Sequence, residues 1–164
     1  MKKVKELMPY IIILIVVVLI RTFVVTPVRV DGSSMYPTLK NGNLLILKKY
    51  DNSYERFDIV VVKMGKERIV KRIIGLPGES IKYTSNHLFI NGKKIDLKKY
   101  DFDTENFDLT DLELSKIPKN SYFVLGDNRS NSMDSRYFGP VSKEDIIGST
   151  DLRFWPLNKI GKIK

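Results

Sequence analysis

The sequence predicts a mainly β protein, in which one compact antiparallel β-sheet domain follows a single N-terminal transmembrane helix. Two observations lead to this fold class. Residues 7–25 are almost entirely apolar, which is long enough for one membrane span. After Pro27 the apolar segments shorten to about four to eight residues, rich in Val and Ile and separated by turn-forming residues. We therefore expect an anchor at residues 1–25 and one domain at 26–164.

The N-terminal helix should be a retained anchor. Residues 11–20 are all apolar, so a helix here has no polar face to turn toward water. Lysines at positions 2, 3 and 5 precede it, and the positive-inside rule then places the N-terminus in the cytoplasm. The domain would lie on the outer face of the cell membrane. Cleavage as a leader is the alternative, but residues 21–25 lack the small side chains that cleavage needs.

Strands in the domain are expected, in chain order, at residues 28–30, 44–47, 59–63, 68–74, 80–83, 88–90, 122–125 and 150–154. Asn91-Gly92 is a tight-turn signal, so residues 88–95 should form a hairpin. Residues 98–114 are acidic and poorly patterned. They indicate a surface excursion, within a wider one around 80–120, with a helical turn opened by Thr110 or Asp111.

Composition narrows the possible functions. The chain has no Cys and one histidine, His87, which excludes a thiol nucleophile and leaves a metal site without clustered ligands. A Ser-His-Asp triad would have to use His87, and we expect neither metal nor cofactor. The formal net charge of +9 favours membrane lipids as partners. Nucleic acid is not expected, because the basic residues are scattered and no aromatic-basic motif occurs.

Lys71 lies in the middle of a predicted strand. Side chains alternate between the two faces of a strand, so Lys71 shares an apolar face with Ile69 and Ile73, whereas Arg72 faces the other side. Burial lowers the pKa of a lysine, and an uncharged amine can take a proton from a hydroxyl. The alternative is a lysine whose stem covers the sheet while its head reaches water.

Two polar segments accompany this strand. Residues 31–39 place two serines beside Gly32, where backbone can approach a substrate closely. Residues 126–140 are densely polar and directly follow a predicted strand, which suits a hydrogen-bond network. Taken singly, each segment is also typical of an ordinary turn or loop.

Together the three segments resemble the signature boxes of bacterial type I signal peptidases, the leader peptidases with a Ser/Lys dyad, in a short Gram-positive-like form. The matching stretches are residues 34–39, 71–79 and 126–136, with 57–61 as the intervening strand motif. The resemblance covers the chain from the anchor to about Trp155. It implies a signal-peptidase/LexA-like β fold and a membrane-bound serine endopeptidase. Such an enzyme cleaves N-terminal signal peptides from exported preproteins after small residues, at Ala-x-Ala-like sites.

The resemblance also implies roles for individual residues. Ser34 would be the acylated nucleophile and Lys71 the general base. The side chain of Ser132 would orient the Lys71 amine. Three charged residues would tie the third segment to the site: Asp127, Asp134 and Arg136.

Part of the oxyanion hole would be the backbone N–H of Ser34. Some members of the family carry a serine two residues before the nucleophile, where this chain has Gly32. The second donor is then a backbone group there or the Ser33 hydroxyl. The substrate would bind as an added β-strand beside two strand segments, in contact with Val30, Asp31, Ile69 and Val70.

Two other classes of protein are alternatives to a signal peptidase. Self-cleaving LexA-type repressors share the dyad by analogy, but they need a DNA-binding segment where this chain has its apolar helix. A non-catalytic membrane-anchored relative that binds preproteins or partner proteins would be expected to have lost Ser34 or Lys71, and both are present. The expected partners are preprotein signal peptides and membrane lipids. The oligomeric state stays open, with a monomer expected.

Overall fold

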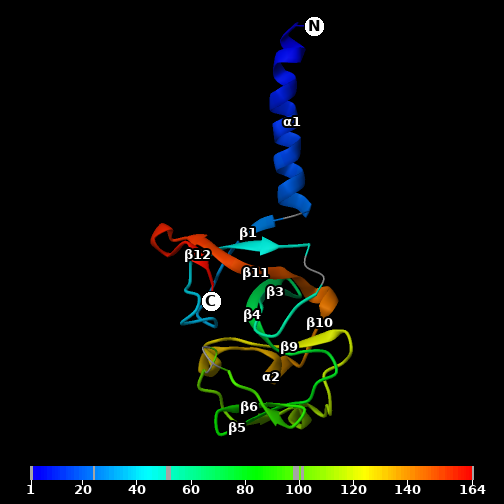
Figure 1. Ribbon diagram of the computed structural model, residues 1–164, viewed down its shortest axis with the longest axis vertical. Coiled ribbons are helices and arrows are strands. Elements are labelled where there is room, and N and C mark those ends of the chain that lie inside the picture. The colour runs from blue at the N-terminus through cyan, green and yellow to red at the C-terminus, as the bar shows by residue number, and fades with distance from the viewer. Residues whose placement is uncertain (1, 24, 51–52, 98–99, 101, 164) are drawn as a thin grey trace.

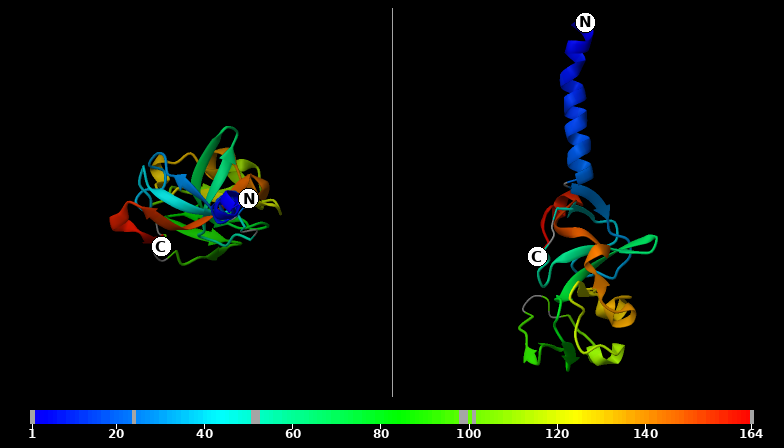
Figure 2. Two further views of the ribbon diagram at one scale, coloured as in Figure 1. Left: turned by 90° about the horizontal axis from the view of Figure 1, so that it is seen from above. Right: turned by 90° about the vertical axis from the view of Figure 1, so that its right-hand side faces the viewer.

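The computed structural model describes residues 2–23, 25–50, 53–97, 100 and 102–163, and within the first 25 residues it places the side chains of residues 7–18. Helix α1 (Lys2–Phe23) projects from one end of a β domain (Figures 1 and 2). Its side chains at 7–18 are exposed. In the part of the chain that the structure describes, no helix is long and apolar enough to cross a membrane.

The larger of two sheets forms the body of the domain. Its strands follow the order β1-β2-β11-β3-β4-β9-β10, with β12 beside β11, and every described pairing is antiparallel. The prediction of a mainly antiparallel β domain is therefore confirmed. The strands are β1 (Val25–Arg29), β2 (Leu44–Lys48), β3 (Ile59–Met64), β4 (Glu67–Gly75), β9 (Ser121–Leu125), β10 (Val141–Ser142), β11 (Ile146–Trp155) and β12 (Gly161–Lys162).

A second, four-stranded sheet lies at the end of the domain far from α1 (Figure 1), in the order β7-β6-β5-β8. Its strands are β5 (Ile81–Thr84), β6 (His87–Ile90), β7 (Lys93–Lys94) and β8 (Phe107–Asp108). The predicted hairpin is confirmed, because β6 pairs with β7 around Asn91 and Gly92, whose φ values are 50° and 76°. Such a pair of positive φ angles is what a tight hairpin turn requires.

The acidic segment was only partly predicted. Residues 98, 99 and 101 lie outside the described residues. The rest is more than a surface excursion, because Phe107, Leu109 and Ile117 are buried. The helical turn exists, as η2 (Leu109–Leu112), but Asp108 caps it by accepting a hydrogen bond from the Thr110 N–H.

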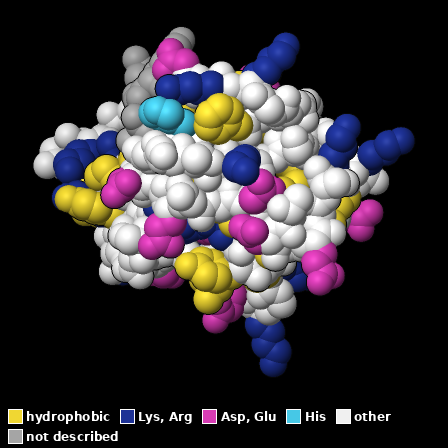
Figure 3. Space-filling model, turned by 90° about the horizontal axis from the view of Figure 1, so that it is seen from below, with side chains coloured by type: hydrophobic (Ala, Val, Ile, Leu, Met, Phe, Trp, Pro, Cys, Tyr) yellow, Lys and Arg dark blue, Asp and Glu magenta, His cyan; other side chains and the backbone are white. Residues whose placement is uncertain are grey.

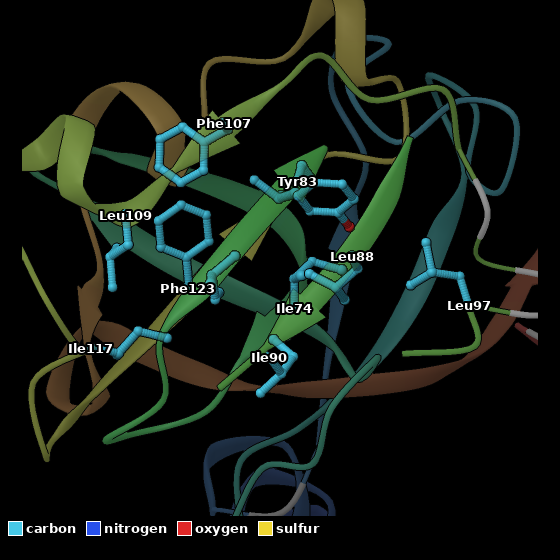
Figure 4. Close-up of a cluster of buried hydrophobic side chains, with 11 residues drawn as sticks. Ile74, Tyr83, Leu88, Ile90, Leu97, Phe107, Leu109, Ile117 and Phe123 are labelled. Carbon is cyan, nitrogen blue, oxygen red and sulfur yellow. The ribbon is translucent and has the colours of Figure 1, made fainter. Parts of the chain in front are cut away.

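A core of apolar side chains joins the two sheets (Figure 4). Ile74 of β4 and Phe123 of β9 meet Tyr83 and Leu88 of the second sheet in one buried cluster. The sheets approach so closely that a methyl group on Gly75 would overlap side chains of the second layer. The far sheet is thus part of the same core as the larger one.

A separate cluster fixes the segment between β1 and β2. Met35 and Leu39 from this segment are fully buried against Leu45, Leu47 and Val61. The strand before this segment was predicted at residues 28–30, whereas β1 lies at Val25–Arg29. The face of the domain farthest from α1 carries acidic and basic side chains interspersed with scattered hydrophobic ones, and the single histidine (Figure 3).

Leu88→Ala tests whether the far sheet shares the core. Leu88 is fully buried and Phe89, next to it, points to the other face of β6, where it is half-buried. We expect Leu88→Ala to lower the free energy of unfolding by about 2–5 kcal/mol. The control, Phe89→Ala, should cost less than half as much. Urea unfolding of the full chain in neutral detergent measures both, and equal losses would contradict the shared core.

Candidate active site

Ser34 lies in the segment between β1 and β2, where its neighbour Met35 is buried. The ends of this segment are joined by backbone hydrogen bonds, from Val30 N to the Asn43 oxygen and from Gly42 N to the Val30 oxygen, both 2.8 Å. Because Met35 points into the core, the partly exposed Ser34 is held at the surface of the sheet. The predicted nucleophile therefore has a fixed backbone.

The Lys71 side chain is 3% exposed on β4, and its strand neighbours Ile69 and Ile73 pack in the same apolar cluster. Its Nζ donates a hydrogen bond of 3.0 Å to Ser132 Oγ. Burial lowers the pKa of Lys71, and this outweighs the opposing attraction of Asp134; the nearby Arg136 lowers it further. The site thus favours an uncharged amine.

The loop after β9 connects these two residues. Asn128 N donates to the Ser34 carbonyl oxygen at 2.9 Å, and Asn128 Nδ2 donates to the Ser33 carbonyl oxygen at 3.1 Å. A methyl group on Gly126 would overlap both Ser132 Oγ and the Ser34 carbonyl oxygen, so these oxygens crowd one point. Among the described residues, no hydrogen bond joins Ser34 Oγ to Lys71 Nζ. Such catalytic contacts often tighten only when substrate binds.

Asp127 fixes this loop to β4. Its carboxylate accepts two hydrogen bonds from Arg72, at 2.8 and 2.6 Å, and the two side chains are 0% and 2% exposed. Arg72 also donates to the Phe57 carbonyl oxygen and lies over the Tyr100 ring. Water is excluded from a bidentate ion pair of this kind, which gives it a well-defined geometry.

Asp134 and Arg136 close the other end of the loop. Asp134 accepts a hydrogen bond from Gly126 N at 3.1 Å and pairs with Arg136 through Nε at 2.9 Å. Arg136 in turn donates to the Arg129 carbonyl oxygen at 2.5 Å. The loop from 126 to 136 is therefore bonded across its own ends.

A cleft of about 370 Å³ opens beside Ser34. Of the predicted substrate contacts, Asp31, Ile69 and Val70 line it, together with Glu67 and Arg68. Val30 does not line it, because its side chain is buried in the core and its backbone groups already bond to Asn43 and Gly42. The structure therefore places Val30 as support beneath the cleft.

The Gly32 backbone and the Ser33 hydroxyl, the two candidates for the second oxyanion donor, differ in the hydrogen bonds that they already make. The Gly32 N–H donates to Asn41 Oδ1 at 3.2 Å, so in this conformation it is engaged elsewhere. The Ser33 hydroxyl accepts a hydrogen bond from Asn131 Nδ2 at 3.0 Å, which leaves its own proton free to be donated. In this conformation the Ser33 hydroxyl proton is therefore available, whereas the Gly32 N–H is engaged.

Sequence reasoning did not assign roles to Arg72, Arg129, Asn128 and Asn131. Arg72 lies among apolar residues on its face of β4, and a charged residue in such a place needs a buried partner of opposite charge. This pattern could have predicted an ion pair for Arg72. Arg129 is buried between the two sheets, where it donates to Gly126, Tyr83 and Thr104. Within the described residues its Nη2 has no hydrogen-bond partner.

Comparison with known proteins identifies the family of this chain. Residues 4–155 match the family model described as "Signal peptidase, peptidase S26". The chain is 44% identical to signal peptidase I P of Bacillus subtilis subsp. natto, over 93% of this chain and 89% of the relative. It is 42% identical to signal peptidase I of Bacillus caldolyticus, over 92% and 91% respectively.

A solved structure is similar as well. The crystal structure of a signal peptidase I from Enterococcus faecalis superposes with a TM-score of 0.54 at 38% identity. The match covers 59% of this chain and 96% of that one. A family model that matches most of the chain, relatives above 40% identity and this structure all agree. The chain therefore belongs to the signal peptidase family, peptidase S26.

Proposed function

We propose that this chain is a membrane-bound serine endopeptidase that removes N-terminal signal peptides from exported preproteins, with Ser34 as nucleophile and Lys71 as general base. The observation that carries the proposal is the buried Lys71 amine, which has a lowered pKa and a hydrogen bond to Ser132 in a loop that also bonds the Ser34 backbone. Membership of the signal peptidase family supports the reaction class.

The reaction follows from the chemistry of the two groups. The uncharged Lys71 amine takes the hydroxyl proton as Ser34 Oγ attacks the scissile carbonyl carbon. The resulting ammonium returns this proton to the leaving amine, and the acyl group stays on Ser34 as an ester. A water molecule, deprotonated by Lys71, then attacks the ester, and the ammonium gives this proton to Ser34 Oγ as the ester C–O bond breaks. The Ser132 hydroxyl acts by holding the amine in line.

An open strand edge supports the mode of substrate binding. Among the described residues, β4 pairs with β9 only from Arg72 onward, whereas residues 67–71 pair with β3 alone. The free edge borders the cleft beside Ser34. An extended preprotein segment can add there as a further strand, with small residues before the cut facing the narrow cleft.

We also propose that α1 anchors the enzyme, with its N-terminus in the cytoplasm and the β domain on the outer face. The helix has 22 residues, a length of about 33 Å. Its apolar side chains at 7–18 are exposed and it projects away from the sheets (Figure 2). Lysines at 2, 3 and 5 support this orientation.

The dyad is tested by Ser34→Ala and Lys71→Met, assayed in vesicles on a precursor with an Ala-x-Ala cleavage site. Each should lower kcat/KM by about a thousandfold or more, because nucleophile and base act as one unit. Lys63→Met, an exposed lysine of β3, is the matched control and should stay near wild type. Full activity in either dyad variant would discard the mechanism, whereas a wild-type chain that cleaves no precursor would favour the non-catalytic binding role.

The lowered pKa of Lys71 favours activity but lowers the stability of the fold. Between the folded and unfolded pKa values the unfolded chain binds the extra proton, so this lysine destabilises the fold there, and the cost disappears as pH rises toward 10.5. Lys71→Met should therefore be more stable than wild type at neutral pH. The difference should shrink with rising pH in urea unfolding series. A constant difference would mean that the amine is charged in the folded protein.

Wild-type activity should rise with pH through the lowered pKa of Lys71, because only the uncharged amine accepts the Ser34 proton.

Ser33→Ala tests the second oxyanion donor. It should lower kcat by about a hundredfold with little change in KM, since the donor acts on charge that develops in the transition state. Ser33→Thr, which keeps a hydroxyl, should recover part of the loss. Unchanged kcat in Ser33→Ala would assign the donor to the backbone.

A further inference from the structure

A second cavity, of about 500 Å³, lies away from the cleft beside Ser34. It opens between the end of β1, the segment at 37–44, the end of β11 and the short helix η5 (Leu157–Lys159). Four cationic side chains line it: Arg29, Lys40, Arg153 and Lys159. No Asp or Glu is among the described lining residues. The cavity therefore carries concentrated positive charge.

Strand register places this cavity at the ends of β1 and β11 and the start of β2. Arg29 is opposite Leu44 on β2, and Leu44 is opposite Trp155 on β11, so the three side chains form a row on one face. The neighbouring Leu45 and Leu47 point the other way, into the core. Ligands can reach the row from solvent without disturbing the fold.

The charge in the cavity is not neutralised internally. Arg153 donates to two backbone carbonyl oxygens, of Lys159 at 2.8 Å and of Thr38 at 3.3 Å, which orient its guanidinium without cancelling its charge. Within the described residues, no ion pair involves Lys40, Arg153 or Lys159. Arg29 lies 3.7 Å from Asp31, with both side chains largely exposed, so this pair is weak.

The position of the cavity near the helix α1 indicates which kind of anion it would bind. β1 follows α1 directly, and both ribbon views place the connection from β11 to β12 at the end of the domain from which α1 projects (Figures 1 and 2). Apolar side chains are exposed at this connection: Trp155 is 47%, Leu157 68% and Ile160 57% exposed. Tryptophan beside apolar and basic residues is typical of the level of lipid head groups.

We propose that this cavity binds the phosphate group of an anionic phospholipid head group, while Leu157 and Ile160 contact the adjoining acyl region. The inference rests on the proposed anchoring by α1, because the anchor brings the cavity to the membrane surface. The cationic side chains would neutralise the charge of the phosphate group. The exposed apolar side chains beside the cavity favour a lipid over free phosphate. Bound lipid would hold this end of the sheet against the membrane. Arg29 lies two residues before Asp31 of the cleft, so this contact also fixes the cleft relative to the membrane.

The chain supplies its own reporter, because Trp155 is its only tryptophan and lines the cavity. The full chain in neutral detergent is titrated with dihexanoyl phosphatidylglycerol while tryptophan emission is recorded. We expect a saturable change that the same concentrations of dihexanoyl phosphatidylcholine and inorganic phosphate do not produce. An equal response to phosphatidylcholine would reduce the site to an apolar contact, and an equal midpoint with inorganic phosphate would make it a free-anion site. Either result overturns the proposal.

Charge variants test the residues. Lys40→Gln/Lys159→Gln removes two charges from exposed side chains and should weaken the phosphatidylglycerol midpoint by about tenfold, since each cation near lipid contributes measurably to affinity. Lys93→Gln/Lys94→Gln removes the same charge from exposed β7, at the opposite end of the domain, and should leave the midpoint unchanged. Equal shifts in both would mean that net charge alone, and no defined site, attracts the lipid.

Ser34→Ala separates this inference from the proposed function. It should abolish precursor cleavage and leave the phosphatidylglycerol titration unchanged, because Ser34 does not line this cavity. Wild-type cleavage without a saturable lipid response would overturn the lipid site and leave the peptidase function standing. A wild-type chain that gives the saturable lipid response but cleaves no precursor would overturn the peptidase function and leave the lipid site standing.

Discussion

The bidentate ion pair between Arg72 and Asp127 is the constraint on which the arrangement of the site depends. A buried ion pair adds little net stability, because desolvation offsets the attraction, but removing one partner leaves an uncompensated buried charge. Its contribution is therefore to geometry. Consecutive residues of β4, Lys71 and Arg72, hold Ser132 and Asp127 of one loop, and the same loop bonds the backbone of Ser34. One strand thus sets the distance between the two halves of the site.

The charge balance around Lys71 follows from this network. Two carboxylates lie near its amine and would by themselves favour the ammonium form. Each of them is already paired with an arginine, Asp127 with Arg72 and Asp134 with Arg136. Burial is the largest influence on the pKa of Lys71 and lowers it, and Arg136 lowers it further against the attraction of the two carboxylates. Arg136 therefore does more than brace the loop, since its positive charge also disfavours the ammonium form of Lys71.

The sheet that carries the nucleophile segment has separate parts for positioning and for contact. Its inner face buries Met35 and Leu39, which fixes the backbone on either side of Ser34. The ends of its strands β1 and β11 present the cationic cavity and the exposed Trp155. In the proposed arrangement, the membrane contacts these strand ends while the open edge of β4 remains free for an extended preprotein segment. A substrate that emerges from the bilayer would then meet the cleft close to the surface.

The sequence by itself determined the β-rich domain, most strand positions and the Asn91-Gly92 hairpin, because alternation and turn chemistry are local properties of the chain. The segments that contain Ser34, Lys71 and Ser132 were singled out by their joint resemblance to one family, since each alone is typical of an ordinary strand or loop. Only the tertiary structure decided that Arg72 pairs with Asp127, that Arg129 bridges the sheets, and that Val30 supports the cleft from below. It also revealed that Phe107, Leu109 and Ile117 enter the core, despite the acidic pattern of the segment around them. These outcomes depend on which distant segments meet: a buried charge or a covered face is defined by its partner, and a local pattern does not contain the partner.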